Sequence, residues 1–272
     1  MNKQKIVNIK ATTLDDCWFQ LVYNIIENGR DFKIDQGSFA GSVRKEFDFI
    51  VAQITMPWIR DEVTGLPRIP KIPEHMNIPA PVSDDYLNNY AGYILGADVS
   101  EDESYTYGQR INKEPVSKEI SDNMVVKNKI YRKFSGSKVL EDIVYDKDKF
   151  LSQVDLAIEV YREHPRTNQM VLQVAKPTDM LLLDPPCLRH IDTRVQDGKL
   201  HFYPYFRSWD LWSGFPANVA GISMLQEHMA YEIGVKQGEM ICASKGLHLY
   251  DYSVDFAKAR CMFVDGDNCK GF

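Results

Sequence analysis

The chain lacks the sequence features that mark several large classes of protein. No run of about 18 apolar residues occurs in it, and the stretch before Asp16 holds no apolar core of the kind found in signal peptides. It also contains no G-x-x-x-x-G-K-S/T phosphate loop, no G-x-G-x-x-G turn and no internal repeat. We therefore expect a cytoplasmic protein with no membrane contact. The absences also argue against Walker-type nucleotide hydrolases and nicotinamide dehydrogenases.

Paired cysteines and an excess of positive charge are lacking as well. The cysteines are odd in number, scattered and without a C-x-x-C pair, which predicts reduced thiols and no metal site; they are Cys17, Cys187, Cys242, Cys261 and Cys269. A net charge of -6 provides no field that would attract DNA or anionic lipid. Any phosphate site must therefore be a local cluster of arginines, and we expect no DNA partner.

The composition is that of a globular chain, with 44% hydrophobic and 26% charged residues in 272. Apolar residues at helical spacing predict helices at residues 13–28, 83–95, 150–164 and 214–233. Apolar runs and alternation predict strands at residues 43–54, from 170, at 240–243 and at 247–252. A further pair of strands flanks Asp197-Gly198, which is a strong hairpin signal.

The other segments are less regular. Six of the 13 prolines lie between Pro57 and Pro81, so residues 57–81 are predicted to form an extended loop. Residues 96–113 also read as a loop, and residues 116–142 predict no particular structure. Because strands and helices interleave without strict alternation, we expect an α/β (α+β) fold in which helices flank a mixed, twisted sheet. No long linker is visible, so residues 1–272 are expected to form a single domain.

Chemically useful side chains are concentrated in the C-terminal half, in PPCLRHID, YFRSWDLWSGFPANVAG and SKGLHLYDY. The predicted hairpin folds the strand that bears Arg207 back beside the strand that follows Cys187. A guanidinium near a thiol lowers the thiol pKa and favours the nucleophilic thiolate. The residues alone leave other roles open: Cys187 as a small buried apolar side chain, Arg207 as a surface ion-pair donor, and His248 as a core histidine.

These motifs, together with YTYGQR around Tyr107, resemble the thymidylate synthase family, and most of all its archaeal-type branch. Nucleotide hydroxymethylases are close relatives of that branch. The resemblance is strong from Pro165 to Tyr252. It implies a thymidylate synthase-like fold, a homodimer, and folate-dependent one-carbon transfer to carbon 5 of a pyrimidine nucleoside monophosphate. The co-substrate is then 5,10-methylenetetrahydrofolate, and no metal is needed.

The resemblance also implies the residues of the reaction. Cys187 matches the nucleophile that adds to carbon 6 of the pyrimidine, which turns carbon 5 into a carbon nucleophile. Tyr107 matches the tyrosine of the family's Y-G motif, which helps position the ring chemistry. Asp210 matches the acid that anchors the pterin.

The remaining matches concern nucleotide binding. Arg207 and Ser208 match the phosphate ligands, and His248 and Tyr250 match the pair that holds the sugar hydroxyl. Asn218 matches the amide that reads the pyrimidine edge, because an amide both donates and accepts hydrogen bonds.

The sequence departs from the family pattern in several places. Leu188 and Phe206 replace a histidine and a glutamine, which puts the family's water network in doubt. Arg166 is a candidate for the arginine that reaches the phosphate across a dimer, and Arg44 is the nearest substitute for the N-terminal phosphate arginine. No residue is assigned as the catalytic glutamate; the candidates are Glu62, Glu74 and Asp84. Only a short tail follows Tyr250.

Three functions stay open from the sequence. The favoured one is thymidylate synthesis, from dUMP to dTMP, in nucleotide biosynthesis. The alternative is a hydroxymethylase acting on dUMP, CMP or dCMP, in which water takes the place of hydride. The third is nucleotide or RNA binding without turnover. Asn218 favours uracil, and Asn218→Asp is expected to shift the preference toward cytosine, unless a water or a neighbouring side chain reads the base instead.

Overall fold

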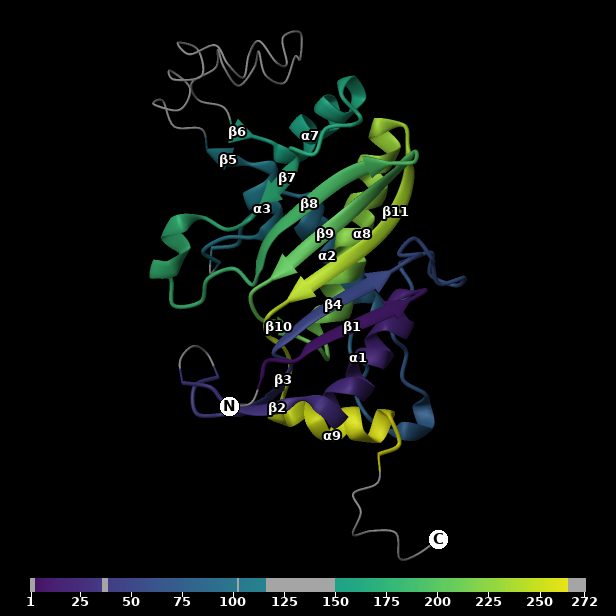
Figure 1. The fold of residues 1–272 in the computed structure, drawn as a ribbon, viewed down its shortest axis with the longest axis vertical. Coiled ribbons are helices and arrows are strands. Elements are labelled where there is room, and N and C mark those ends of the chain that lie inside the picture. The colour runs from purple at the N-terminus through teal and green to yellow at the C-terminus, as the bar shows by residue number, and fades with distance from the viewer. Residues whose placement is uncertain (1–2, 36–38, 102, 116–149, 264–272) are drawn as a thin grey trace, which may run out of the picture.

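The computed structural model describes residues 3–35, 39–101, 103–115 and 150–263. Its centre is a six-stranded mixed sheet with the strand order β1-β4-β11-β9-β8-β7 (Figure 1). The strands are β1 (Ile6–Ala11), β4 (Phe49–Ile54), β7 (Val171–Gln173), β8 (Leu188–Gln196), β9 (Lys199–Phe206) and β11 (Lys236–Ser244). β1 and β4 are parallel, as are β9 and β11, and the other neighbours are antiparallel.

Two smaller sheets accompany the central one. A four-stranded sheet has the order β10-β12-β3-β2 and consists of β10 (Trp209–Asp210), β12 (Leu247–Tyr250), β3 (Val43–Glu46) and β2 (Arg30–Lys33). A two-stranded ribbon pairs β5 (Glu114–Pro115) with β6 (Phe150–Leu151). The four-stranded sheet matters for function, because β10 and β12 lie within the site motifs of the sequence.

Helices cover one face of the central sheet, with α8 running behind β9 and β11 (Figure 1). The helices are α1 (Leu14–Asn28), α2 (Asp84–Leu95), α3 (Tyr107–Asn112), α7 (Gln153–Glu163), α8 (Gly214–Ile233) and α9 (Asp251–Arg260). Buried side chains from the covered face and from these helices form one large core cluster that includes Trp18, Phe202, Phe206 and Phe215. None of the described helices is long and apolar enough to cross a membrane.

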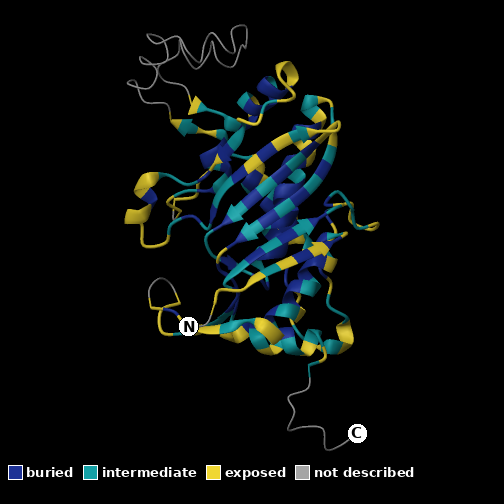
Figure 2. Cartoon of the chain, in the orientation of Figure 1, coloured by how far each residue is buried: buried dark blue, intermediate teal, exposed yellow. Residues whose placement is uncertain are grey.

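The opposite face of the sheet carries half-buried side chains, and in Figure 2 its strands alternate between buried and partly exposed positions. Val51 on β4, Ile241 on β11 and Tyr203 on β9 all point to this face, since their neighbours along each strand are buried in the core. His190 and Tyr205 stack there with ring centroids 5.7 Å apart. No described helix covers these side chains, and we call this surface the open face.

Most of the expected elements form, and the mixed α/β class is confirmed. The helix at residues 214–233 matches α8, and the hairpin forms with Asp197 and Gly198 at φ values of 52° and 71°. These positive values suit a two-residue hairpin turn that matches the strand twist. Ser83 caps α2 by accepting a hydrogen bond from the Tyr86 amide, 3.1 Å away. The proline-rich loop holds a 3-10 turn, Glu74–Met76, and an isolated antiparallel bridge between Arg60 and Pro67.

Four expectations were wrong in part. The predicted strand at residues 43–54 is two strands in different sheets, because the chain turns between Glu46 and Phe49 and the Phe47 amide bonds to Leu247. The predicted loop at residues 96–113 contains α3, which Thr106 caps. Phe150 lies in β6 and not in a helix. Helix α9 follows β12 where a strand to residue 252 was expected. Residues 116–142 lie outside the described residues.

Candidate active site

The fold brings the thiol and the arginine of the sequence motifs together at one end of the β8-β9 hairpin. Cys187 directly precedes β8, and Arg207 directly follows β9. The Arg207 amide donates to the Cys187 carbonyl oxygen over 2.9 Å, so the two residues are backbone neighbours. This is the proximity that the hairpin predicts.

The Cys187 thiol is subject to opposing influences. Burial raises its pKa above the usual value, and this is the largest effect, whereas Arg207, Arg189 and Arg44 lower the pKa and Asp184 raises it. The arginine therefore acts in the expected direction, but the expectation of a lowered thiol pKa is not met, because desolvation outweighs the positive charges. Three arginines nevertheless lie within electrostatic range of one thiol, which makes this a region suited to an anion.

Arg207 fixes the loop that leads to the thiol. Its Nε donates to the carbonyl oxygen of Pro186 over 3.2 Å, and its Nη2 donates to that of Pro185. The same Nη2 lies 3.4 Å from an oxygen of Asp184, a contact that is exposed to solvent and therefore weak. Ser208 follows in the turn between β9 and β10 and is half-buried. It is a close neighbour of Gly246, since a Cβ added to that glycine would lie 3.5 Å from the Ser208 Cα.

Tyr107 reaches the same place from the first turn of α3. Its hydroxyl oxygen accepts a hydrogen bond from the Leu188 amide, 3.3 Å away, next to the thiol. Burial raises the pKa of Tyr107 well above its usual value, so the phenol stays protonated at neutral pH. The phenol proton is therefore available to a group bound beside Cys187.

Asp210 is fixed at the start of α8. One carboxylate oxygen accepts from the Trp212 amide at 3.1 Å, and the other accepts from the amides of Ser213 and Gly214 at 3.1 and 3.0 Å. These amides have no partner within the helix, so Asp210 satisfies the helix end and is itself rigidly oriented. Burial raises the pKa of Asp210, and the three hydrogen bonds oppose that shift.

Asn218, one turn further along α8, is held at both ends of its amide. Its Oδ1 accepts from the indole Nε1 of Trp209 at 2.8 Å, and its Nδ2 donates to the hydroxyl oxygen of Tyr90 at 2.6 Å. Neither partner was identified from the sequence. The sequence does indicate Tyr90 as a candidate, because Tyr86, Tyr90 and Tyr93 recur at helical spacing in the helix predicted at residues 83–95.

His248 and Tyr250 lie side by side on β12, with ring centroids 4.6 Å apart. Burial lowers the pKa of His248 to about 4, so the ring is neutral at pH 7. Its Nδ1 lies 2.9 Å from the Gly246 carbonyl oxygen, which can only accept, so Nδ1 carries the proton. Nε2 is then a buried acceptor, and it has no hydrogen-bond partner among the described residues.

The two further arginine candidates differ in their placement. Arg44 lies on β3 opposite Tyr250, and its Nε is 2.6 Å from an oxygen of the buried Glu46. Arg166 lies in the turn between α7 and β7. Met170, four residues after Arg166, accepts a hydrogen bond through its carbonyl oxygen from the Thr193 hydroxyl. Thr193 lies toward the end of β8 that is remote from Cys187, so Arg166 is not near the thiol of its own chain.

A cavity of about 420 Å³ lies between α2, α3 and α8 and borders this group; its lining residues are Tyr86, Asn89, Tyr90, Tyr93, Glu103, Tyr107 and Asn218. Aromatic faces suit a flat heterocycle, and the polar tips supply hydrogen bonds at its edge. Glu103 is the carboxylate that lines this cavity, and none of Glu62, Glu74 and Asp84 does. Glu103 gave no sequence signal, because it lies in a segment that reads as a polar loop.

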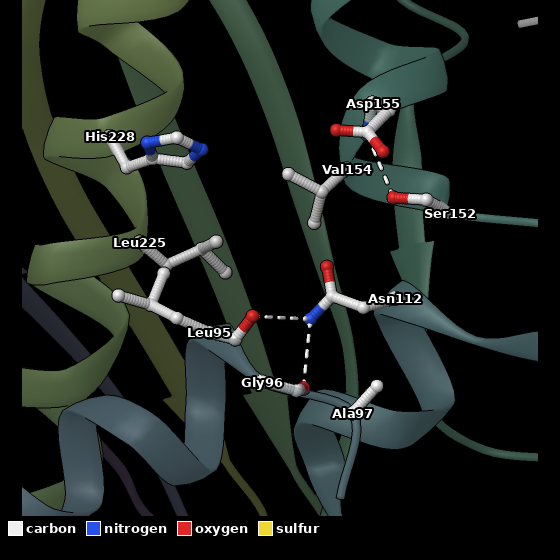
Figure 3. A pocket seen from close by; sticks show the side chains of 9 residues that line it. All are labelled: Leu95, Gly96, Ala97, Asn112, Ser152, Val154, Asp155, Leu225 and His228. Carbon is white, nitrogen blue, oxygen red and sulfur yellow. Dashed lines mark hydrogen bonds between the residues drawn. The ribbon is translucent and has the colours of Figure 1, made fainter.

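A second cavity, of about 410 Å³, lies between the ends of α2 and α3 and the helices α7 and α8 (Figure 3). In it the amide nitrogen of Asn112 donates to the carbonyl oxygens of Leu95 and Gly96, which end α2. No residue of the predicted site lines this cavity. Within the described part of the chain, no group of three His, Cys, Asp or Glu side chains is placed to hold a metal ion.

Comparison with known proteins places the chain in a family of methyltransferase-type enzymes. The family model described as "Thymidylate synthase" matches residues 93–262, which is more than half of the chain. The chain therefore belongs to the thymidylate synthase family, as the sequence motifs indicate.

Similar proteins are found in archaea and bacteria. A Methanosarcina barkeri protein named "Putative thymidylate synthase" is 24% identical over 251 residues, with 92% of each chain covered. A protein of the same name from Methanosarcina mazei is 25% identical over 253 residues, with 92% of each chain covered. The "Thymidylate synthase" of Listeria innocua is 25% identical over 187 residues, which is 61% of this chain and 57% of the relative.

Proposed function

We propose that this chain transfers a one-carbon unit from 5,10-methylenetetrahydrofolate to carbon 5 of dUMP and so produces dTMP and dihydrofolate. The observation that carries the proposal is the geometry around Cys187. The thiol lies within electrostatic range of three arginines, and the residue after it bonds to Tyr107, which lines an aromatic cavity together with the Asn218 amide.

The first role of the residues is to bind the phosphate of the nucleotide. A phosphate dianion placed among Arg207, Arg44 and the Ser208 hydroxyl would gain charge-assisted hydrogen bonds. The lone acceptor at His248 Nε2 suits a sugar hydroxyl, because such a group brings the donor that this buried nitrogen lacks. Tyr250 offers a second hydroxyl close by.

The second role is addition to the ring. The Cys187 thiolate forms a bond to carbon 6, and the ring electrons move toward the carbonyl oxygen at carbon 4, so carbon 5 can attack the one-carbon unit of the folate. The proton at carbon 5 is then lost as the bond between the transferred carbon and the folate nitrogen breaks, which leaves an exocyclic methylene on the ring and tetrahydrofolate beside it. Hydride from this tetrahydrofolate would add to the methylene, and the thiolate leaves carbon 6 as the ring double bond re-forms, which gives dTMP and dihydrofolate. Tyr107 holds its hydroxyl next to the Leu188 amide, beside the reacting sulfur.

The folate would occupy the tyrosine-lined cavity. Tyr86, Tyr90 and Tyr93 stack in sequence along α2, with successive ring centroids 6.0 and 5.4 Å apart. Such a surface accepts a flat pterin or aminobenzoyl ring. Asp210 keeps unused lone pairs beside its three amide donors, and it supplies a fixed acceptor at the start of α8.

The assembly we propose is a homodimer of single-domain subunits in the cytoplasm, where thiols stay reduced. The continuous core cluster, which includes residues from all the central strands, supports one domain. The open face supports a dimer, because an isolated sheet face with valine, isoleucine and tyrosine side chains favours burial against a partner. Arg166 would then reach the phosphate of the partner subunit.

Tritium release from carbon 5 of labelled dUMP tests the role of Cys187. We expect Cys187→Ser to slow release by at least about 1,000-fold, because no thiolate can add to carbon 6. Binding of dUMP should persist, because the phosphate and sugar contacts remain. Cys261→Ser, at a half-buried thiol beyond α9, is the matched control and should keep full release. Near-normal release by the Cys187 variant would refute the mechanism.

A further inference from the structure

The amide of Asn218 is held by two neighbours with different hydrogen-bonding abilities. The indole N–H of Trp209 can only donate, so the amide oxygen must face it. The hydroxyl of Tyr90 can donate or accept, so it would tolerate either end of the amide. Trp209 alone therefore decides which way the amide points.

Trp209 cannot easily move away from this contact. Its ring stacks on Phe206 with centroids 3.8 Å apart and packs against Phe215 at 4.7 Å. Its backbone amide bonds to the Gly246 carbonyl oxygen at 2.9 Å within the four-stranded sheet. The side chain is 2% exposed, so a reversed amide would leave two buried donors face to face.

We propose that Trp209 is a specificity-determining residue that locks Asn218 in one orientation and so makes the site select uracil over cytosine. This inference rests on the proposed function. With one contact at each end, the amide keeps a second lone pair on Oδ1 and a second hydrogen on Nδ2. Uracil offers a donor at N3 and an acceptor at O4, which match this pair, whereas cytosine offers an acceptor and a donor and would need the amide reversed.

Phe206 takes part indirectly, because its stacked ring keeps the indole in place. It is a position where the sequence departs from the family pattern, and the same is true of Leu188, its partner in the β8-β9 register. Both side chains are fully buried. They therefore offer no polar group to read the base in place of Asn218.

The test compares the binding of dUMP and dCMP, measured by calorimetry in the Cys187→Ser background, so that chemistry does not intervene. Trp209→Phe removes the N–H and keeps an aromatic ring, and we expect the preference for dUMP to fall by about 10- to 100-fold. Tyr90→Phe is the matched control. It weakens binding of both nucleotides but should leave the preference within about threefold, since a hydroxyl does not set the amide orientation.

A second variant covers the case in which Trp209→Phe does not fold. Benzothienylalanine incorporated at position 209 keeps the shape of the indole and replaces its N–H by sulfur, and it should lower the preference to the same degree. An unchanged preference in either variant, with the parent discriminating, would overturn the role of Trp209 and leave the proposed function intact. A parent that binds neither nucleotide would overturn the proposed function, and this inference with it.

Discussion

At Cys187, burial and the nearby arginines shift the thiol pKa in opposite directions, and burial prevails. A thiol with a raised pKa is mostly protonated at neutral pH, and its thiolate fraction grows as the pH rises. The value of kcat/KM, which reports on the free enzyme, should therefore increase with pH through the neutral range. A bound phosphate dianion would cancel part of the positive charge of the arginines and so raise the thiol pKa further. The arginine charge that is not cancelled then sets how much thiolate forms.

Arg189 provides the cleanest change of that charge. Its Nη1 donates to the Pro186 carbonyl oxygen at 3.1 Å, and its positive charge lowers the thiol pKa. Removing the charge in Arg189→Gln should raise that pKa, so the acid limb of the kcat/KM profile moves to higher pH by roughly half a unit or more. Arg68→Gln removes an exposed charge that pairs with Asp15 and serves as the control. An unshifted profile for Arg189→Gln would show that this arginine does not act on the thiol.

At the scale of elements, the cavity depends on how closely α2 approaches α8. Tyr90 lies across α8 at Gly221, where a Cβ would fall 2.6 and 2.7 Å from its ring carbons. Real Cβ atoms do not approach this closely, so only glycine lets the two helices pack as they do. The same contact places the Tyr90 hydroxyl against Asn218, three residues earlier on α8.

Gly221→Ala should therefore destabilise the fold, even though alanine is the better helix former. We expect a loss of about 1–3 kcal/mol in the free energy of unfolding, from overpacking against Tyr90. Gly92→Ala on α2 is the matched control, because nothing lies within 4 Å of its added Cβ. It should gain up to about 1 kcal/mol from helix propensity. Urea denaturation measures both, and a Gly221 variant as stable as its parent would contradict the packing described.

Periodicity and turn chemistry predict much of this architecture, because α8, the Asp197-Gly198 hairpin and the Ser83 cap depend on local sequence. The split of residues 43–54 between two sheets could not be predicted, because an alternating pattern does not show which partner each half pairs with. Helix α9 was missed because its polar and apolar residues do not follow a helical stripe.

In the site, too, contacts between residues that are close in the sequence could be predicted, and contacts between distant elements could not. The hairpin predicts that Arg207 and Cys187 are neighbours, because they flank one turn. The contacts of Asn218 with Trp209 and Tyr90 join different elements, and only the folded chain shows them. The thiol pKa was expected to fall because the sequence shows the arginine but not the burial that outweighs it.

At the scale of the whole molecule, the open face is a sheet surface that no described helix covers. Its side chains come from β4, β8, β9 and β11 and combine apolar and aromatic groups, such as Val51, Ile241 and Tyr203, with polar ones, such as Gln53 and Glu239. The helices on the other face complete the core of the subunit. A two-fold dimer would bury the open face against its own copy and give each subunit two covered sheet faces.

Sedimentation at micromolar concentration tests the dimer. The parent should sediment at twice the chain mass of 31.3 kDa. Ile241→Glu puts a charge on the open face and should give monomers, because a buried unpaired carboxylate is costly. Tyr231→Glu, at an 81% exposed position near the end of α8, should stay dimeric. A parent that sediments only as the single chain would refute the dimer.

A dimer also gives Arg166 a role that it cannot have within one chain. If it reaches the phosphate of the partner subunit, Arg166→Gln and Cys187→Ser should each be inactive alone. A mixture that exchanges subunits should recover activity, because the mixed dimer contains one intact site. No recovery, with subunit exchange shown by labelled chains, would place Arg166 outside the site.

The most direct test of the central claim is the mass of the product formed from dUMP and methylenetetrahydrofolate, with UMP, dCMP and CMP assayed in parallel. Our account predicts that dUMP is the preferred substrate and gains a methyl group in place of the hydrogen at carbon 5, with dihydrofolate as the second product. A product that carries a hydroxymethyl group, with tetrahydrofolate released, would contradict thymidylate synthesis in favour of a hydroxymethylase. No new product from any of the four nucleotides would contradict one-carbon transfer altogether.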